Sequence, residues 1–224
     1  MSSVGRDRAI MVDLCRQRGI KSEAVLSAML TVPREKFVSE NLLEKSHGDH
    51  PLPIPEGQTI SQPLMVAMMT EALELSNDSN FSVLEVGTGC GYQACIISEI
   101  CRNGRVFTIE RIGALLTEAS SRIRSLGYDN VQCKHADGHK GWKENSPFDR
   151  IIVTAGAQVV PPDLIEQLKV GGIMIIPAHT ERSRNLCDDF AETQELLKIT
   201  KESAARVSIK SLGGCRFVPL VKDP

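Results

Sequence analysis

Two acidic side chains and a run of alternating glycines have the types and spacing to do chemistry. Gly87, Gly89 and Gly91 follow an apolar stretch that carries Glu85, and the next apolar stretch ends at Glu110. Glycines let a chain turn tightly from strand to helix and let a ligand approach the backbone closely. An acid that closes the following strand is placed to accept hydrogen bonds from a ribose diol. The pattern predicts a site for a nucleoside cofactor.

The spacing of the glycines favours one class of nucleoside. A dinucleotide fingerprint has a third glycine five positions after the first, whereas this chain has Tyr92 there. Glu85 precedes the loop by two residues, where a carboxylate would repel a pyrophosphate and attract a cation. We therefore expect the sulfonium S-adenosyl-L-methionine, with S-adenosyl-L-homocysteine as its product. A nicotinamide cofactor is the alternative.

Each acidic residue has a plainer interpretation as well. Glu110 lies 23 residues after Gly87, about the separation of a ribose-binding acid, but it could simply be solvated. Glu85 would be costly if buried and unpaired, so we expect loop amides or the amino group of the cofactor to partner it. Asp137 and Gly138 follow a third apolar stretch. They form either an ordinary turn or the contact to the adenine amino group.

Ser61 has two interpretations that can hold together. It precedes a helical pattern over 62–74, with Pro63 in the first turn, so it is a good N-cap. Its hydroxyl and the neighbouring amides could also lie over the methyl group of the cofactor.

The elements that must position these residues alternate along the chain. Strands are predicted over 81–86, 105–110, 131–135, 148–153 and 173–176, with helices between them. Such alternation predicts an α/β fold, a doubly wound and mostly parallel Rossmann-like sheet whose ligand lies at the C-terminal strand ends. The glycines and acids above all fall at that edge.

The flanks of this core follow other patterns. Residues 4–45 are predicted to be helical, and the proline-rich stretch 51–63 to be ordered but irregular. In the tail we expect a helix around 192–197 and antiparallel edge strands near 206–209 and 215–220. We expect one domain over 1–224, with a helical segment (1–75), a cofactor-binding core (76–180) and C-terminal strands (181–224).

Composition excludes several classes of function. The 224 residues carry a formal net charge of −2, so a nucleic-acid partner is not expected. Seven cysteines without a Cys-x-x-Cys pair and five scattered histidines predict neither a metal site nor a disulfide framework. With no apolar signal segment and no run of membrane-spanning length, we expect no membrane partner and a cytoplasmic location.

Several segments together resemble one family, the protein-L-isoaspartate (D-aspartate) O-methyltransferases. The resemblance covers nearly the whole chain. Two of its segments, Gly57–Pro63 and Arg216–Leu220, are more specific to this family than the glycine loop. Its main segments are Val32–Val38, Gly57–Pro63, Val83–Tyr92, Thr108–Arg111 and Arg216–Leu220. Gly156 departs from the family pattern by interrupting an alanine-rich stretch, and residues 44–50 and 179–214 match poorly.

The resemblance implies methyl transfer to the free carboxylate of L-isoaspartyl residues, and less well of D-aspartyl residues, in age-damaged proteins and peptides, which starts their repair. It implies that Ser61 is the active-site residue and that the final Val-Pro-Leu segment contributes to the substrate cleft. We expect a monomer. The positions implied to line the cofactor site are Gln58, Thr59, Ile60, Ser61, Glu85, Gly87, Gly89, Gly91, Glu110, Asp137 and Gly138.

The absence of a catalytic histidine or cysteine agrees with this chemistry. A carboxylate nucleophile with a pKa near 4 is already ionised, so the reaction needs placement and desolvation rather than a general base. The rival interpretations are a methyltransferase for nucleic acids or small molecules, a nicotinamide oxidoreductase and a non-catalytic cofactor-binding module. The first usually carries an Asn/Asp-Pro-Pro-aromatic turn after the fourth strand, where this chain has Thr154 to Ala157.

Overall fold

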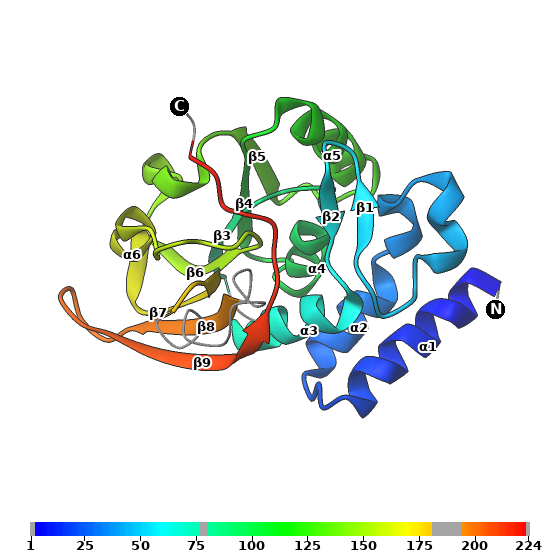
Figure 1. Ribbon diagram of the computed structural model, residues 1–224, viewed down its shortest axis with the longest axis horizontal. Coiled ribbons are helices and arrows are strands. Elements are labelled where there is room, and N and C mark those ends of the chain that lie inside the picture. The colour runs from blue at the N-terminus through cyan, green and yellow to red at the C-terminus, as the bar shows by residue number, and fades with distance from the viewer. Residues whose placement is uncertain (1–2, 77–79, 181–193, 223–224) are drawn as a thin grey trace, which may run out of the picture.

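A seven-stranded sheet forms the centre of the molecule in the computed structural model, which describes residues 3–76, 80–180 and 194–222. The strand order is β5-β4-β3-β6-β7-β8-β9 (Figure 1). The first five of these strands run parallel, and β8 and β9 add antiparallel pairs at one edge. The bounds are β3 (Ser82–Val86), β4 (Arg105–Glu110), β5 (Val131–His135), β6 (Phe148–Val153), β7 (Leu168–Ala178), β8 (Gln194–Lys201) and β9 (Val207–Cys215). The doubly wound α/β fold is confirmed.

Helices cover both faces of the sheet and create two cores. Along β3, Val83 packs into one core while Leu84 and Val86 pack into the other, because successive strand residues point to opposite faces. Both faces are buried, which explains the continuous apolar runs of the parallel strands. The first core is shared with α1 (Ser3–Gln17), α2 (Glu23–Thr31), α3 (Pro63–Ala72), α4 (Tyr92–Ile100) and α5 (Gly113–Ser125), and the second with α6 (Pro162–Gln167).

The proline-rich stretch forms a β-hairpin, so the prediction of an irregular segment was wrong. Strand β1 (Leu52–Ile54) pairs antiparallel with β2 (Gln58–Ile60), apart from the central sheet. A two-stranded sheet consists only of edge strands, where Pro53 is tolerated. Leu52, Ile54 and Ile60 anchor the hairpin in the first core. Before it, two short 3-10 helices span Arg34–Phe37 and Glu40–Lys45.

The C-terminal region contains the other errors of prediction. The helix expected around 192–197 is strand β8 from Gln194 onward, and its first two residues lie outside the described part of the chain. A short apolar run such as Leu196-Leu197 fits a buried strand as well as a helix. Strand β7 begins at Leu168 and passes through the predicted Gly171-Gly172 turn with a register shift against β6. Edge strand β9 exists but is longer than expected.

The last predicted strand, 215–220, is not a strand. Residues 216–221, which we call the C-terminal strap, instead cross the carboxyl edge of the sheet (Figure 1). One isolated bridge joins Pro219 to Gly156. The strap therefore covers the strand ends at which the ligand site was predicted.

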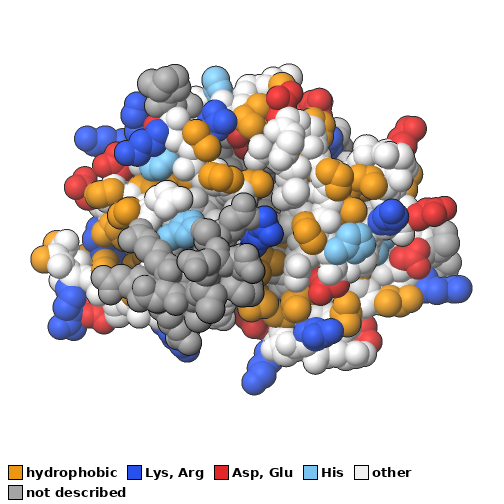
Figure 2. Space-filling view, viewed as in Figure 1, with side chains coloured by type: hydrophobic (Ala, Val, Ile, Leu, Met, Phe, Trp, Pro, Cys, Tyr) orange, Lys and Arg blue, Asp and Glu red, His pale blue; other side chains and the backbone are white. Residues whose placement is uncertain are grey.

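The surface shows no segregation of charge on the face that Figure 2 displays. Lys and Arg side chains alternate with Asp and Glu around its rim. Within the described ranges, no helix combines the length and apolar character needed to cross a bilayer.

Candidate active site

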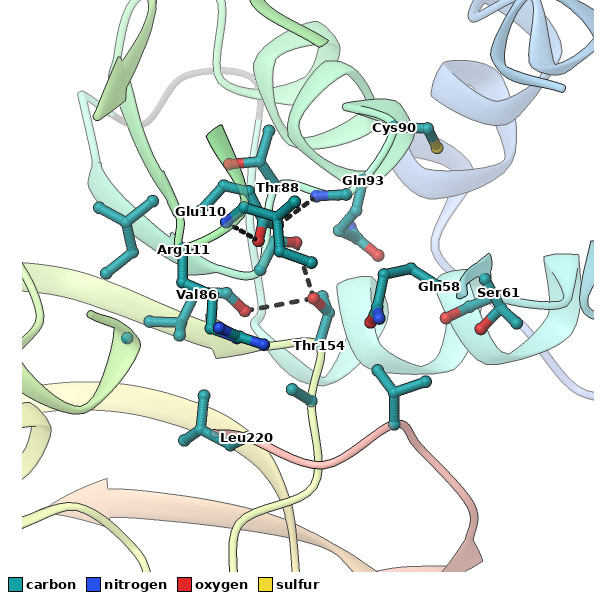
Figure 3. A pocket seen from close by; sticks show the side chains of 18 of the residues that line it. Gln58, Ser61, Val86, Thr88, Cys90, Gln93, Glu110, Arg111, Thr154 and Leu220 are labelled. Atoms are coloured by element: carbon teal, nitrogen blue, oxygen red, sulfur yellow. Dashed lines mark hydrogen bonds between the residues drawn. The ribbon is translucent and has the colours of Figure 1, made fainter. Parts of the chain in front are cut away.

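A cavity opens at the carboxyl ends of β3 and β4, with about 900 Å³ of space when solvent at its mouth is included. Three segments meet around it: the glycine loop (residues 87–91), the end of the β1–β2 hairpin and the C-terminal strap (Figure 3). This concave form, with polar groups among apolar ones in its lining, suits a small-molecule ligand. The predicted site residues that line it are Gln58, Thr59, Ile60, Ser61, Gly87, Gly89, Glu110 and Gly138.

Glu85 lies beneath the glycine loop rather than in the cavity wall. It is completely buried and accepts a hydrogen bond from the Thr108 hydroxyl on β4, which in turn pairs with the Thr88 hydroxyl at 2.7 Å. Among the described residues its Oε1 has no partner. Burial raises the pKa of Glu85 to about 8. The neighbouring strand thus supplies a hydroxyl where loop amides were expected, so that part of the expectation was wrong, whereas a bond between Glu85 and the cofactor stays a prediction.

Two further predicted residues also lie outside the cavity wall. Asp137 accepts a hydrogen bond from the His139 amide at 2.9 Å, and its Oδ1 lies 3.2 Å from His139 Nδ1. Burial opposes ionisation of Asp137, but these bonds outweigh it and the pKa lies below its usual value. Gly91 directly precedes α4, and its amide donates to the Thr88 carbonyl at 2.8 Å. Of the two residues Asp137 and Gly138, it is Gly138 that lines the cavity.

Glu110 joins the glycine loop to the following strand. Its Oε2 accepts from the Gly89 amide at 3.0 Å, and its Oε1 accepts from the Ile112 amide, also at 3.0 Å. The side chain is buried yet still lines the cavity. A carboxylate oxygen has more than one lone pair, so Glu110 can accept further hydrogen bonds from the hydroxyls of a ribose.

Gly87 permits close packing at the floor of the cavity. Its φ is +100°, and a Cβ there would overlap the Thr154 hydroxyl. That hydroxyl donates to the Gly87 carbonyl at 2.8 Å (Figure 3). The glycine thus lets the loop pack directly on Thr154, and both residues line the cavity. Glu110 and Arg111 are the charged residues lining the cavity in the described chain, so it offers a ligand one carboxylate and one guanidinium.

Sequence reasoning assigned no role to several residues of the cavity wall. Gln93 is a buried polar residue on α4 that donates to Thr70 at 2.9 Å, and a polar position on an otherwise apolar helix face could have indicated it. Thr154 directly follows β6, and its place after the fourth predicted strand had put it at this edge of the sheet. The unassigned lining residues include Val66, Met69, Val86, Thr88, Cys90, Tyr92, Gln93, Ile112, Thr154 and Ala155.

Ser61 does not cap the helix that follows it, contrary to prediction. Helix α3 begins at Pro63, and its N-cap residue Gln62 makes no side-chain capping bond. The Leu64 amide instead donates a hydrogen bond to Asp49 Oδ1 at 3.0 Å. Within the described residues the Ser61 hydroxyl has no hydrogen bond, whereas its carbonyl accepts one from Arg34 at 2.7 Å. The hydroxyl therefore remains available to a ligand in the cavity wall.

A second groove shares part of its wall with the cavity. Ser61, Thr59 and Thr154 line both, as do Val218 and Pro219 of the strap. Gln194 holds the strap in place, since its Oε1 accepts from the Phe217 amide at 2.8 Å and its Nε2 donates to the Phe217 carbonyl at 3.2 Å.

Gly156 provides a further attachment of the strap. Its amide donates to the Val218 carbonyl, and its carbonyl accepts from the Leu220 amide, both at 2.8 Å. A Cβ at position 156 would overlap the Gln194 amide. The glycine that departs from the family pattern thus makes room for the side chain that clamps the strap.

Comparisons with known proteins agree over nearly the whole chain. A family model described as Protein-L-isoaspartate(D-aspartate) O-methyltransferase matches residues 5–224. The protein-L-isoaspartate O-methyltransferase of Desulfosudis oleivorans is 48% identical, covering 98% of this chain and 93% of its own length. That of Methanothermobacter thermautotrophicus is 45% identical, with 96% and 94% covered.

Solved structures give the same result. A protein-L-isoaspartate O-methyltransferase has a TM-score of 0.83 at 29% identity over 95% of this chain, which spans 65% of the length of that solved chain. A putative protein-L-isoaspartate O-methyltransferase from Plasmodium falciparum, in complex with S-adenosyl-L-homocysteine, has a TM-score of 0.80 at 27% identity, with 96% and 99% covered.

Proposed function

Because this chain belongs to the protein-L-isoaspartate(D-aspartate) O-methyltransferase family, we propose which of its residues perform the reaction. The chain transfers a methyl group from S-adenosyl-L-methionine to the free carboxylate of L-isoaspartyl residues in proteins and peptides. The glycine-loop cavity holds the methyl donor, the second groove holds the damaged segment of the acceptor, and Ser61 lies between them. D-aspartyl residues are acceptors as well.

The position of Ser61 carries this proposal. It lines both hollows, so a group held there can touch a ligand in either one. Its hydroxyl has no partner within the described residues, while its backbone is fixed by Arg34. A methyl transfer needs donor and acceptor in contact along one line, and the shared wall of the two hollows is where such contact can occur.

The residues of the cavity fit S-adenosyl-L-methionine. Gly87 and Gly89 present bare backbone, Glu110 offers acceptor lone pairs to the ribose hydroxyls, and Gly138 leaves space at the end of β5. Gln58, Thr59 and Ile60 close the cavity from the hairpin side. When bound, the cofactor supplies an electrophilic methyl group on a positively charged sulfur.

Ser61 acts on the acceptor. Its hydroxyl donates a hydrogen bond to one oxygen of the isoaspartyl carboxylate and leaves the other oxygen free to attack. The free carboxyl group has an ordinary pKa near 4 and is ionised at neutral pH, so no residue has to remove a proton. Val218 and Pro219 of the strap line both hollows and exclude water from the carboxylate. Removing water makes the carboxylate a better nucleophile.

The test of the reaction uses labelled S-adenosyl-L-methionine and two peptides that differ only in having aspartate or isoaspartate at one position. We expect labelling of the isoaspartyl peptide alone. Equal labelling of both peptides, or of neither, would contradict the assignment.

The test of Ser61 is the variant Ser61→Ala, with Ser208→Ala on the exposed edge strand β9 as its control. A hydrogen bond to a charged group contributes about 1.5–3 kcal/mol. The expected loss in kcat is therefore roughly 10- to 100-fold, with the affinity for S-adenosyl-L-homocysteine unchanged. Full activity of Ser61→Ala would rule out the role.

A further inference from the structure

Arg34 is a buried cation placed directly behind Ser61. Its side chain has no solvent exposure, and burial lowers the pKa of the guanidinium. Its Nε donates to the Ser46 carbonyl at 2.8 Å and its Nη2 donates to the Ser61 carbonyl at 2.7 Å. Nη1 has no hydrogen-bond partner among the described residues. Both acceptors are neutral carbonyls, and within the described residues Arg34 forms no ion pair, so the favourable electrostatics from Tyr92, Cys90 and Asp49 offset only part of the cost of burying this charge.

The two carbonyls lie at the two ends of the hairpin. Ser46 precedes β1 and Ser61 follows β2, so one rigid guanidinium fixes both ends of the segment between them. The fork of an arginine is planar and holds its acceptors in fixed directions, which a lysine cannot do. The guanidinium carbon also lies 4.9 Å from the centre of the Tyr92 ring, at the start of α4. Arg34 therefore connects the hairpin to the helix that follows the glycine loop.

Ser61 is held from both directions along the chain. Before it, Ile60 pairs with Leu52 in the hairpin, and after it the Leu64 amide is bound by Asp49. The bond from Arg34 fixes the orientation of the peptide unit that begins with the Ser61 carbonyl. Once these neighbours are fixed, the direction of the Ser61 side chain from its Cα is fixed as well.

We propose that Arg34 is a positioning residue for the methyl transfer. It holds the Ser61 backbone so that the hydroxyl points into the wall shared by the cavity and the groove. This inference rests on the role assigned to Ser61 above. A small displacement of a catalytic group can lower the rate by as much as about 100-fold. This explains why an arginine occupies position 34, where an apolar residue could be buried at a lower cost in free energy.

The test is Arg34→Lys in the full chain, because lysine keeps the charge but cannot hold both carbonyls in one plane. We expect kcat on an isoaspartyl peptide to fall roughly 10-fold or more, a larger factor than the loss of affinity for S-adenosyl-L-homocysteine measured by calorimetry. Arg150→Lys is the matched control, since Arg150 also donates to backbone carbonyls, those of Leu73 and Asp149, but from the half of β6 that lies away from the carboxyl edge of the sheet. It is expected to leave kcat unchanged. If Arg34→Lys does not fold, Arg34→Gln is measured in the same way.

A double-mutant cycle with Ser61→Ala separates a positioning role from a structural one. If Arg34 acts through the Ser61 hydroxyl, Arg34→Lys lowers kcat less than 2-fold when that hydroxyl is already absent, because coupled residues are not additive. The same loss in both backgrounds, or wild-type kcat in Arg34→Lys alone, would overturn the inference and leave the role of Ser61 intact. Full activity of Ser61→Ala would instead overturn the role of Ser61 and this inference with it.

Discussion

The two halves of the site are built by different means. In the donor half, around the glycine loop, backbone groups of neighbouring strands carry the structure: the Gly87 amide donates to the Ile109 carbonyl and the Thr154 amide to the Val86 carbonyl, both at 2.9 Å. In the acceptor half, around Ser61 and the strap, side chains bind distant backbone, as Asp49 and Gln194 do. A backbone ladder tolerates most substitutions, whereas each side-chain bond depends on one residue.

The largest expected effect concerns Glu85 in the donor half, because burying this acid lowers the stability of the fold. Burial raises the pKa of Glu85 from 4.5 to about 8, so the folded state holds a proton that the unfolded state releases above pH 4.5. This acid is therefore expected to lower stability as pH rises through that window, by roughly 3 kcal/mol between pH 5 and 8. Glu85→Gln should remove most of this pH dependence in chemical unfolding. The exposed Glu118→Gln is the control, and an unchanged slope in Glu85→Gln would show that Glu85 stays ionised.

Gly87→Ala tests whether the donor half depends on bare backbone. An alanine would have to adopt a φ of +100° and would overlap Thr154. The strain of about 1–2 kcal/mol, together with this overlap, should displace the loop and weaken S-adenosyl-L-homocysteine binding by roughly 100-fold, measured by calorimetry. Gly171→Ala has a similar φ of +80° but open space around it. It should lose stability without losing affinity, and equal losses of affinity would contradict the comparison.

Gln194→Leu tests the acceptor half. Leucine keeps much of the volume but removes both bonds to Phe217. Two neutral hydrogen bonds contribute about 1–2 kcal/mol, so KM for an isoaspartyl peptide should rise roughly 10-fold while cofactor affinity stays the same. Steady-state kinetics with Gln132→Leu, an exposed position on β5, provide the control. A change in cofactor affinity instead would show that the two halves are not independent.

The smallest expected effect distinguishes Asp49 from Ser61 as the cap of α3. Loss of an N-terminal cap costs about 1 kcal/mol, so Asp49→Ala should lower the free energy of unfolding by that amount. Ser61→Ala should leave it unchanged, because the Ser61 hydroxyl binds no amide of the helix. Urea unfolding measures both, and the reverse result would restore the capping role to Ser61.

This difference between the halves also explains what the sequence could predict. Strand ends in the donor half follow from apolar periodicity, and β6 was predicted with its observed bounds, Phe148–Val153. The glycine loop and Glu110 then line one cavity because parallel strands end at one edge. The acid Glu85 was placed in the correct strand, but its partner Thr108 is 23 positions away and has no signal of its own in the sequence.

The acceptor half resisted prediction for a physical reason. The ends of its hairpin, its cap at Asp49 and its strap depend on side-chain bonds between residues 12 to 27 positions apart, which local sequence periodicity does not reveal. Serine is a favoured N-cap residue, yet in the folded chain Asp49, which is distant in sequence, accepts the bond from the first turn of the helix. Arg34 looks like an ordinary charged residue of a short helix until the fold buries it.

The close contact between Gly156 and Gln194 constrains which substitutions these two positions can accept during evolution. An alanine at position 156 would collide with the Gln194 amide, so that substitution is expected to be harmful as long as glutamine is present. A shorter residue at 194 would remove the collision but also release the strap. A lineage that reaches alanine at 156 must therefore provide another attachment for the strap, whether Gln194 moves aside or is replaced. These two positions are expected to be inherited as a pair.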